Sequence, residues 1–245
     1  MQKYATVRDI PPSKAKNLDL DLIVYRNVLY KVIALSNPKE YKERDESRPS
    51  FDAKRVISIR LAKMLINLAQ AKNEIVDPFC GTGTILQEAL LMGYNVRGID
   101  LSTREAHQNL KWLGQYQHKI KLYQGDVKEA LPKLSSIESV VTEPYLGPFL
   151  TKLPTEQQAQ KMVNELRPLY ETVLSLLATR VKGKIVMIIP EFRTRTKTFS
   201  IDMPLILEKA GLMISTILPN VKVPYKYIKT GANLDRLIYI LEQKK

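Results

Sequence analysis

The residues with the clearest capacity for chemistry lie in one short stretch, Asp77–Thr84, which reads DPFCGTGT. Apolar runs flank it on both sides, so the pattern predicts a strand, a tight turn and a helix. Gly81 and Gly83 allow the backbone to turn sharply and to approach a ligand closely. The helix that follows directs unpaired N–H groups toward the same place. The stretch therefore predicts a nucleotide-type pocket, whereas a βα turn without a ligand is the alternative for a GxG pattern taken alone.

The residues around the two glycines narrow the class of nucleotide. A dinucleotide fingerprint requires a third glycine where Leu86 stands, and a phosphate-binding loop requires a Gly-Lys-Ser/Thr sequence that is absent from this stretch. Asp77 instead places a carboxylate at the end of the strand. This carboxylate would repel a pyrophosphate, but it can accept hydrogen bonds from the ammonium of an amino-acid-like ligand. These features indicate S-adenosylmethionine.

A second carboxylate, Asp100, ends the next predicted strand, Asn95–Asp100. In a parallel βαβ unit, an acidic residue at the tip of the second strand lies beside the first glycine turn, where it can accept hydrogen bonds from both ribose hydroxyls. Helix capping is the alternative for Asp100, especially as Ser102 follows it. The pairing of this residue with the glycine turn favours the ribose role.

The stretch Asp77–Thr84 resembles the first motif of class I methyltransferases that modify amino groups of nucleic-acid bases, and most of all that of tRNA guanosine-N2 methyltransferases. Two further segments carry the resemblance, which runs from about Asn37 to the C-terminus: Tyr41–Pro49 (YKERDESRP) and Val141–Gly147 (VTEPYLG). The resemblance implies S-adenosylmethionine as the cofactor and tRNA as the substrate. The cofactor-binding residues that it implies are Asp77, Phe79, Gly81, Gly83, Thr84, Asp100 and Asp126.

Asp126 has the weakest sequence context of these residues. It lies in Gly125-Asp126-Val127, after the predicted strand 119–124. In the resembling family an acidic residue at this point accepts a hydrogen bond from the adenine amino group. The alternative is that Asp126 caps a helix that starts near Val127.

The segment Glu143–Gly147 (EPYLG) stands where the resembling family has Asp-Pro-Pro-Tyr-Gly, so the resemblance implies Glu143, Pro144 and Tyr145 as catalytic residues. An exocyclic base amine is a poor nucleophile because its lone pair is delocalised into the ring. A carboxylate and a backbone carbonyl that accept its two N–H bonds would localise that pair. Glu143 can do this, and the ring of Tyr145, one position before the family's tyrosine, could stack on an extruded base. A strand end followed by a proline-bounded loop is the alternative.

The whole chain is expected to be an α/β protein with a doubly wound, mostly parallel seven-stranded sheet of the class I methyltransferase, Rossmann-like type. The predicted strands are 75–77, 95–100, 119–124, 137–142, 184–190, 212–218 and 237–241. The predicted helices are 54–71, the one after Gly83, 103–116, one from Val127, one or two over 156–181, interrupted or begun again near Arg167-Pro168, and 204–211.

The N-terminal part is expected to be separate from this fold. Residues 1–50 are interpreted as a small β-rich appendage and linker, with two short strands around Arg26-Asn27, and residues 51–245 as the methyltransferase domain. Composition alone favours a solvated linker for 36–50, whereas the resemblance implies that it packs near the cofactor. The relatives carry a THUMP RNA-binding domain before this linker, and the residues before Asn37 are too few to form one.

The net charge of the chain indicates the kind of partner that it binds. The chain has 38 Lys and Arg against 25 Asp and Glu, a formal net charge of +13, which favours a polyanion such as RNA. Lys222–Lys229 interleaves basic and aromatic residues, a pattern that suits a single-stranded or flipped nucleotide, with surface decoration as the alternative. Arg193, Arg195 and Lys197 stand on alternate positions, which suits phosphate contacts or a solvated loop.

Composition also limits the class of protein. The single cysteine excludes an internal disulfide, and two histidines make a metal site improbable, so no metal is expected. No apolar run approaches the ~20 residues of a membrane span, and the first 13 residues lack the apolar core of a signal peptide. We therefore expect a cytoplasmic protein with no membrane partner.

The expected activity is methyl transfer to the N2 amine of a guanosine in tRNA, and three alternatives remain. A DNA amino-methyltransferase would use the same chemistry, although the Tyr41–Pro49 segment argues against it. A protein-glutamine methyltransferase would require Asn-Pro-Pro-Tyr, which Glu143 disfavours. A catalytically silent RNA-binding subunit is the third, because the Pro-Pro-Tyr portion is altered. A protein partner that supplies RNA recognition is compatible with each interpretation that involves RNA.

Overall fold

The structure, a computed structural model, describes residues 22–25, 28–31, 38–49, 57–217, 221–229 and 231–244. The chain divides into two compact units, Met1–Arg44 and Asp45–Lys245. The expected domain boundary between residues 50 and 51 stays a prediction.

The first unit contains a pair of short antiparallel strands, β1 (Leu22–Tyr25) and β2 (Val28–Lys31), as predicted. The turn residues Arg26 and Asn27 lie outside the described residues. Helix α2 (Pro38–Glu46) follows, in the segment whose composition favours a solvated linker. Lys39 and Glu43 form an ion pair at 3.6 Å one helical turn apart, a contact that supports a polar helix without any apolar stripe.

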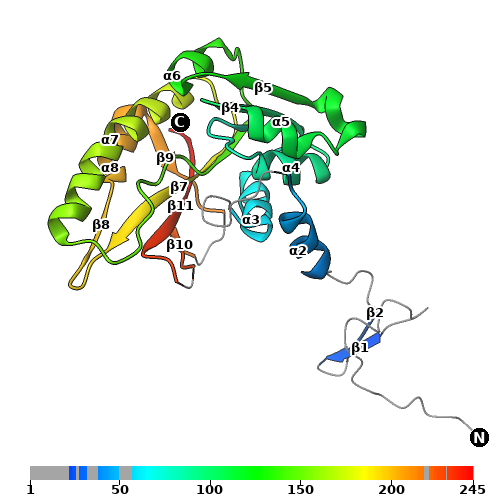
Figure 1. Ribbon diagram of the computed structural model, residues 1–245, viewed down its shortest axis with the longest axis horizontal. Helices are drawn as coiled ribbons and strands as arrows, with labels where there is room; N and C mark the ends of the chain where they lie inside the picture. The colour runs from blue at the N-terminus through cyan, green and yellow to red at the C-terminus, as the bar shows by residue number, and fades with distance from the viewer. Residues whose placement is uncertain are drawn as a thin grey trace, which may run out of the picture. The chain divides into compact units, whose positions relative to one another are not determined.

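The second unit is built on one sheet in the order β10-β11-β7-β6-β3-β4-β5 (Figure 1). Its strands are β3 (Glu74–Asp77), β4 (Asn95–Asp100), β5 (Ile120–Gln124), β6 (Ser139–Thr142), β7 (Ile185–Arg193), β10 (Tyr225–Tyr227) and β11 (Leu234–Gln243). The five strands from β5 to β7 are mutually parallel, and β11 runs antiparallel to β7. The predicted fold class, a doubly wound and mostly parallel α/β sheet, is confirmed.

Two further short strands belong to the same sheet but lie off this path. β8 (Thr198–Ser200) pairs with β7, and β9 (Leu212–Ile214) pairs with β11. β9 and β10 contact successive parts of β11, at Leu241–Gln243 and Arg236–Ile238, so together they form a broken edge strand. The predicted strand 212–218 is therefore too long, and β8 and β10 fall in stretches for which no strand was expected.

Helices cover both faces of the sheet (Figure 1). One face carries α3 (Ile59–Ala69), α4 (Thr84–Leu91) and α5 (Arg104–Leu110); the other carries α6 (Val127–Ala130), α7 (Glu156–Ala178) and α8 (Met203–Ala210). Short 3-10 turns are η1 (Gly114–Lys119) and η2 (Leu131–Lys133). Alternate residues of β7 enter the two cores: Met187 and Ile189 on the α7 side, Val186 and Ile188 on the α3 side.

Two helix predictions are wrong in extent. α5 ends at Leu110 rather than near residue 116, because the chain turns there into η1. α7 continues through Pro168 without an interruption. Pro168 is exposed, so the carbonyl that lacks an N–H partner one turn earlier can be hydrated, while buried residues such as Tyr170 and Leu174 hold the helix to the sheet. No helix in the described part of the chain is long and apolar enough to cross a membrane.

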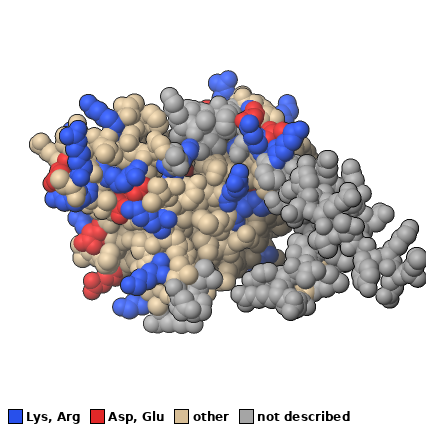
Figure 2. All heavy atoms as spheres, turned by 90° about the horizontal axis from the view of Figure 1, so that it is seen from below, with Lys and Arg blue, Asp and Glu red and all other residues tan. Residues whose placement is uncertain are grey.

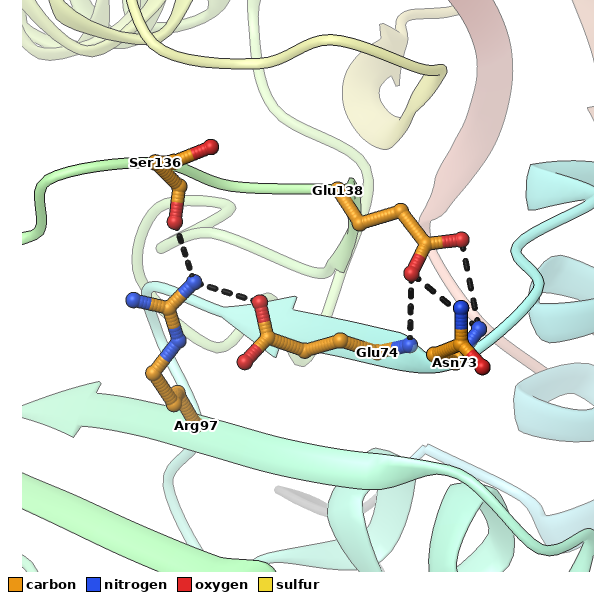
Figure 3. Close-up of polar contacts among 5 residues, drawn as sticks. All are labelled: Asn73, Glu74, Arg97, Ser136 and Glu138. Atoms are coloured by element: carbon orange, nitrogen blue, oxygen red, sulfur yellow. Dashed lines mark hydrogen bonds and ion pairs between the residues drawn. The ribbon is translucent and has the colours of Figure 1, made fainter.

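Contacts at the amino ends of β3 and β6 fix how these strands line up (Figure 3). The Glu138 carboxylate, just before β6, accepts hydrogen bonds from the backbone N–H groups of Asn73 and Glu74, at 3.1 and 2.9 Å to Oε2. Arg97 of β4 forms an ion pair with Glu74 and donates to the carbonyl oxygen of Ser136. These bonds hold the register of three parallel strands, so their opposite, carboxyl ends meet at one edge.

Candidate functional site

The glycine turn lies between β3 and α4, as predicted. Gly81 and Gly83 have φ values of +47° and +83°, in the left-handed region that favours glycine. Gly83 N donates to Cys80 O at 2.7 Å and caps α4 without a side-chain bond. A Cβ atom on Gly83 would also lie 3.4 Å from the Cα and Cβ atoms of Ala106. The turn therefore requires these glycines, and it leaves the N–H groups of the first turn of α4 directed to the carboxyl edge of the sheet.

Asp100 lies against this turn. Its Oδ2 accepts a 2.8 Å hydrogen bond from Gly81 N, and its Oδ1 accepts one of 3.2 Å from Ser102 N. The alternative that Asp100 caps the next helix is wrong, because the N-cap residue of α5 is Thr103. The predicted proximity of Asp100 to the glycine turn is present, and contact with a ribose stays a prediction.

Asp77 is buried at the end of β3. Its Oδ1 accepts hydrogen bonds from Phe79 N at 3.1 Å and from the Thr142 hydroxyl at 2.7 Å. Burial raises the pKa of Asp77 to about 7, against the lowering effect of these two donors and with a smaller raising effect from the charges of Asp100 and Glu143. Asp77 is therefore a carboxyl group that changes charge near neutral pH.

Thr84, the first residue of α4, contacts a residue of the upstream segment Tyr41–Pro49. The buried Arg48 donates from Nη1 to Thr84 Oγ1, and Thr82 Oγ1 lies 3.4 Å from the same oxygen. Phe79 is half-buried and packs against the core on the α7 side. Arg48 thus places the end of the 36–50 segment beside the glycine turn, and packing near a cofactor stays a prediction for this segment.

Asp126 caps a helix in the structure. It is the N-cap of α6, and its Oδ1 accepts a 2.8 Å hydrogen bond from Lys128 N. The preceding residue, Gly125, donates from N to Asp100 O at 2.9 Å, which brings the ends of β5 and β4 together. The capping alternative is therefore realised, and the adenine contact stays a prediction for this carboxylate.

Glu143 follows β6 and is paired. Its Oε1 accepts a 2.5 Å hydrogen bond from Arg236 Nε of β11, and the two side chains are only 13% and 15% exposed. Pro144 is buried, whereas Tyr145 is 59% exposed. The backbone oxygen of Tyr145 accepts a 3.1 Å bond from the Tyr170 hydroxyl, whose pKa is raised by burial and by the charge of Glu143. The loop is thus fixed while one aromatic ring faces solvent.

Several residues at this edge were not expected from the sequence. Thr142 and Arg236 bond to the candidate carboxylates, and Asn109 of α5 donates to Thr82 O at 2.9 Å. Leu101, directly after Asp100, is 73% exposed although it is apolar. The position of Leu101 could have been noticed in the sequence, because this apolar residue directly follows the acidic residue that ends a predicted strand. Arg236 gave none, because it is separated from Glu143 by 93 positions.

Several of the basic residues expected to contact RNA form ion pairs with acidic residues of the same chain. Lys226 forms ion pairs with Glu191 and, at 3.1 Å, with the buried Asp235. Arg193 lies 3.4 Å from Asp235, and Lys197 lies 2.9 Å from Glu156. Arg193, Lys197 and Lys226 thus have acidic partners, and phosphate contact stays a prediction for them. Figure 2 shows Lys and Arg in several separate groups among acidic side chains on one face.

Comparison with known proteins agrees with this geometry. The chain is 29% identical over 212 residues to the tRNA (guanine(10)-N2)-dimethyltransferase of Pyrococcus abyssi, covering 84% of this chain and 56% of that protein. It is 32% identical over 143 residues to the protein of the same name from Methanocaldococcus jannaschii, covering 52% of this chain and 41% of that one. The chain thus spans about half the length of these relatives.

Among solved structures, TrmN from Thermus thermophilus superposes with a TM-score of 0.55 at 17% identity, over 91% of this chain and 59% of that one. This likeness supports the fold alone. The family described as "RMKL-like, methyltransferase domain" matches residues 48–203, from Arg48 into the start of α8. That match includes the glycine turn and all the candidate carboxylates named above, and it covers well over half of the chain. The protein therefore belongs to the RMKL-like methyltransferase domain family.

Proposed function

We propose that this protein is an S-adenosylmethionine-dependent RNA methyltransferase that acts on the exocyclic N2 amine of a guanosine in tRNA. The observation that carries the proposal is the position of three carboxylates: Asp77, Asp100 and Glu143 stand at the carboxyl ends of β3, β4 and β6, which are neighbours in the sheet. Ligands of doubly wound folds bind at this edge. The names of the curated relatives support tRNA guanine-N2 as the target.

The cofactor site that we propose uses the residues around the glycine turn. Asp77 would accept hydrogen bonds from the ligand's ammonium, and Asp100 from its ribose hydroxyls, because Asp100 already lies beside Gly81. Leu101 would cover one face of the adenine, since its exposed side chain follows Asp100 directly, and Asp126 lies on the adjoining strand end. When bound, S-adenosylmethionine supplies an electrophilic methyl group.

The proposed catalytic part lies one strand away. Glu143 accepts one N–H of the guanine amine, and the backbone oxygen of Pro144 accepts the other, which localises the nitrogen lone pair. Within the described part of the chain, Oε1 of Glu143 is bonded to Arg236 and Oε2 makes no hydrogen bond, so Oε2 is available to the amine. Tyr145 offers an exposed ring on which the base can stack.

The proposed partner is tRNA in the cytoplasm. A net charge of +13 suits a polyanion, and it remains after every acidic residue, including the partners of Lys226, has been counted. The chain spans about half of the relatives' length, so we propose that additional RNA-binding surface comes from a further segment or a protein partner. The proposal extends to methylation of the amine and leaves the number of methyl groups transferred to experiment.

Single-turnover methyl transfer to tRNA by a Glu143→Gln variant tests the proposal. The glutamine amide would keep an acceptor oxygen for Arg236 but lose the charge, so transfer should fall by one or more orders of magnitude while S-adenosylhomocysteine still binds. Glu191→Gln is the matched control, because the Glu191 side chain is also only 15% exposed and is paired with a basic residue, Lys226. It should transfer at close to the wild-type rate.

The outcomes separate the alternatives. A wild-type rate in Glu143→Gln would contradict the catalytic role of Glu143. A wild type that binds tRNA and S-adenosylhomocysteine but transfers no methyl to any RNA would favour a silent RNA-binding subunit. Methylation of a DNA duplex in preference to tRNA would favour the DNA amino-methyltransferase.

A further inference from the structure

Arg236 reaches the candidate catalytic residue from a distant strand. In the sheet order, β7 lies between β11, which carries Arg236, and β6, which precedes Glu143. The backbone of Arg236 is paired on both sides, opposite Pro190 of β7 and opposite Tyr227 of β10. Its Cα position is therefore fixed by the sheet, and its side chain crosses β7 to place Nε 2.5 Å from Glu143 Oε1.

Glu143 has no comparable anchor of its own. It follows the last residue of β6, and a glutamate side chain has three rotatable bonds whose rotamers put the carboxylate in different places. Its only hydrogen bond among the described residues is to Arg236, a charge-assisted bond in a largely buried setting. Arg236 thus selects the rotamer and decides which carboxylate oxygen remains open.

We propose that Arg236 is the positioning residue for Glu143: it holds Oε1 so that Oε2 is presented to the substrate amine. This inference rests on the proposed function of Glu143. Arg236 itself touches neither methyl donor nor amine in this scheme; it acts through Glu143. Correct orientation of reacting groups contributes much of the rate in such reactions, so a carboxylate free to change rotamer would serve poorly.

A neighbouring pair provides a control for the role of the contact. Arg193 of β7 also forms an ion pair with an acidic residue of β11, Asp235, at 3.4 Å, and it does not bond to Glu143. Arg193→Met therefore removes the same chemical group from the same part of the sheet without changing the candidate catalytic carboxylate. A purely structural role for Arg236 predicts similar behaviour of the two variants once they are folded.

The test is a double-mutant cycle in single-turnover methyl transfer at saturating tRNA and S-adenosylmethionine. Arg236→Met should reduce the rate at least tenfold in the protein with Glu143, and should cause less than a twofold further loss in Glu143→Gln. Arg236→Lys should recover part of the rate, because an ammonium can still bond Oε1 without the fork of the guanidinium. Arg193→Met should stay within twofold of the wild type.

The inference fails if folded Arg236→Met transfers at the wild-type rate, or if the losses in Arg236→Met and Glu143→Gln multiply. Folding is judged by S-adenosylhomocysteine binding, and Arg236→Lys carries the test if the methionine variant does not fold: a wild-type rate there overturns the inference. Failure of the proposed function has a different signature, since the wild type itself would then transfer no methyl group. That result overturns the inference as well.

Discussion

The hydroxyl of Thr142 donates a 2.7 Å hydrogen bond to Oδ1 of Asp77, so the last residue of β6 holds the last residue of β3. This bond joins the proposed cofactor side of the edge to the proposed catalytic side, because Glu143 is the next residue. It also favours the ionised form of Asp77, whereas burial favours the neutral form. The protonation state of one carboxyl group therefore depends on both strands.

Asp77 predicts a pH dependence of stability. Its pKa is about 7 when folded, against an ordinary value of 3.8, so between about pH 4 and pH 7 the folded protein holds a proton that the unfolded chain has lost. The contribution of Asp77 to the free energy of unfolding should thus decrease as pH rises through this window, by up to about 4 kcal/mol. Urea unfolding of wild type and Asp77→Asn across pH 4–8 measures it. Parallel curves for the two proteins would contradict the assignment.

Thr142→Val predicts a change in cofactor binding. If the ionised Asp77 binds the ligand's ammonium, wild-type affinity for S-adenosylhomocysteine should rise as pH increases through about 7. Removing the Thr142 hydroxyl removes a donor that lowers the pKa of Asp77, so the rise should move to higher pH. Calorimetric titrations from pH 5.5 to 9 detect the move. Thr82→Val is the control, because Thr82 does not bond to Asp77, and an unmoved profile in Thr142→Val would contradict the role of this bond.

Asp100 should recognise the ribose and also support the glycine turn, through the bond from Gly81 N. We expect Asp100→Asn to fold and to bind S-adenosylhomocysteine about tenfold more weakly, since an amide oxygen can replace only one acceptor. The sharper measurement compares this ligand with its 2′-deoxy analogue. Wild type and Asp126→Ala should prefer the natural ribose, whereas Asp100→Ala should bind both ligands equally. An undiminished preference in Asp100→Ala would remove the ribose assignment.

Tyr145 should act through its ring alone, because its backbone oxygen is bonded to Tyr170 whatever the side chain. Stacking on a base contributes ~1–3 kcal/mol, so Tyr145→Ala should slow methyl transfer about 5- to 150-fold, and Tyr145→Phe should restore it. Trp112→Ala is the control, since that ring is similarly exposed but lies after α5. Single-turnover rates decide, and equal rates for Tyr145→Ala and wild type would exclude stacking at this position.

The fold and the glycine turn could be predicted because both depend on local sequence. Strand β4 matches its predicted bounds, and the φ values of Gly81 and Gly83 follow from a pattern of two glycines one residue apart. Buried parallel strands give continuous apolar runs, so their existence is also visible in the sequence. What decides their lengths is less visible: β9 ends at Ile214, whose partner is Leu241, and β11 pairs with β10 further along.

The contacts that tune the site could not be predicted because they join distant positions. Arg236 lies just before the predicted strand 237–241, and only the order β6-β7-β11 brings it to Glu143. Asp126 could be located from the sequence but its role could not be chosen, because an acidic residue at this position suits both helix capping and adenine binding. The alternation of basic and aromatic residues around Lys226 does not show that this cation already has acidic partners.

Lys226 and Arg195 should separate a structural cation from an RNA-binding one. Lys226→Met would leave the buried Asp235 with one fewer cationic partner, so it should lower the free energy of unfolding by about 1–3 kcal/mol. Arg195 is exposed and has no ion pair among the described residues, so Arg195→Gln should leave the free energy of unfolding within about 0.5 kcal/mol of the wild type.

If Arg195 contacts a phosphate, the slope of log affinity for tRNA against log salt should decrease by about 0.7–0.9 in Arg195→Gln. Lys226→Met should keep the wild-type slope, because its ammonium is engaged by Glu191 and Asp235. Urea unfolding and tRNA binding at several salt concentrations measure both quantities on the same proteins. A flattened slope in Lys226→Met with unchanged stability would reverse the assignment and make Lys226 the residue that meets the phosphate.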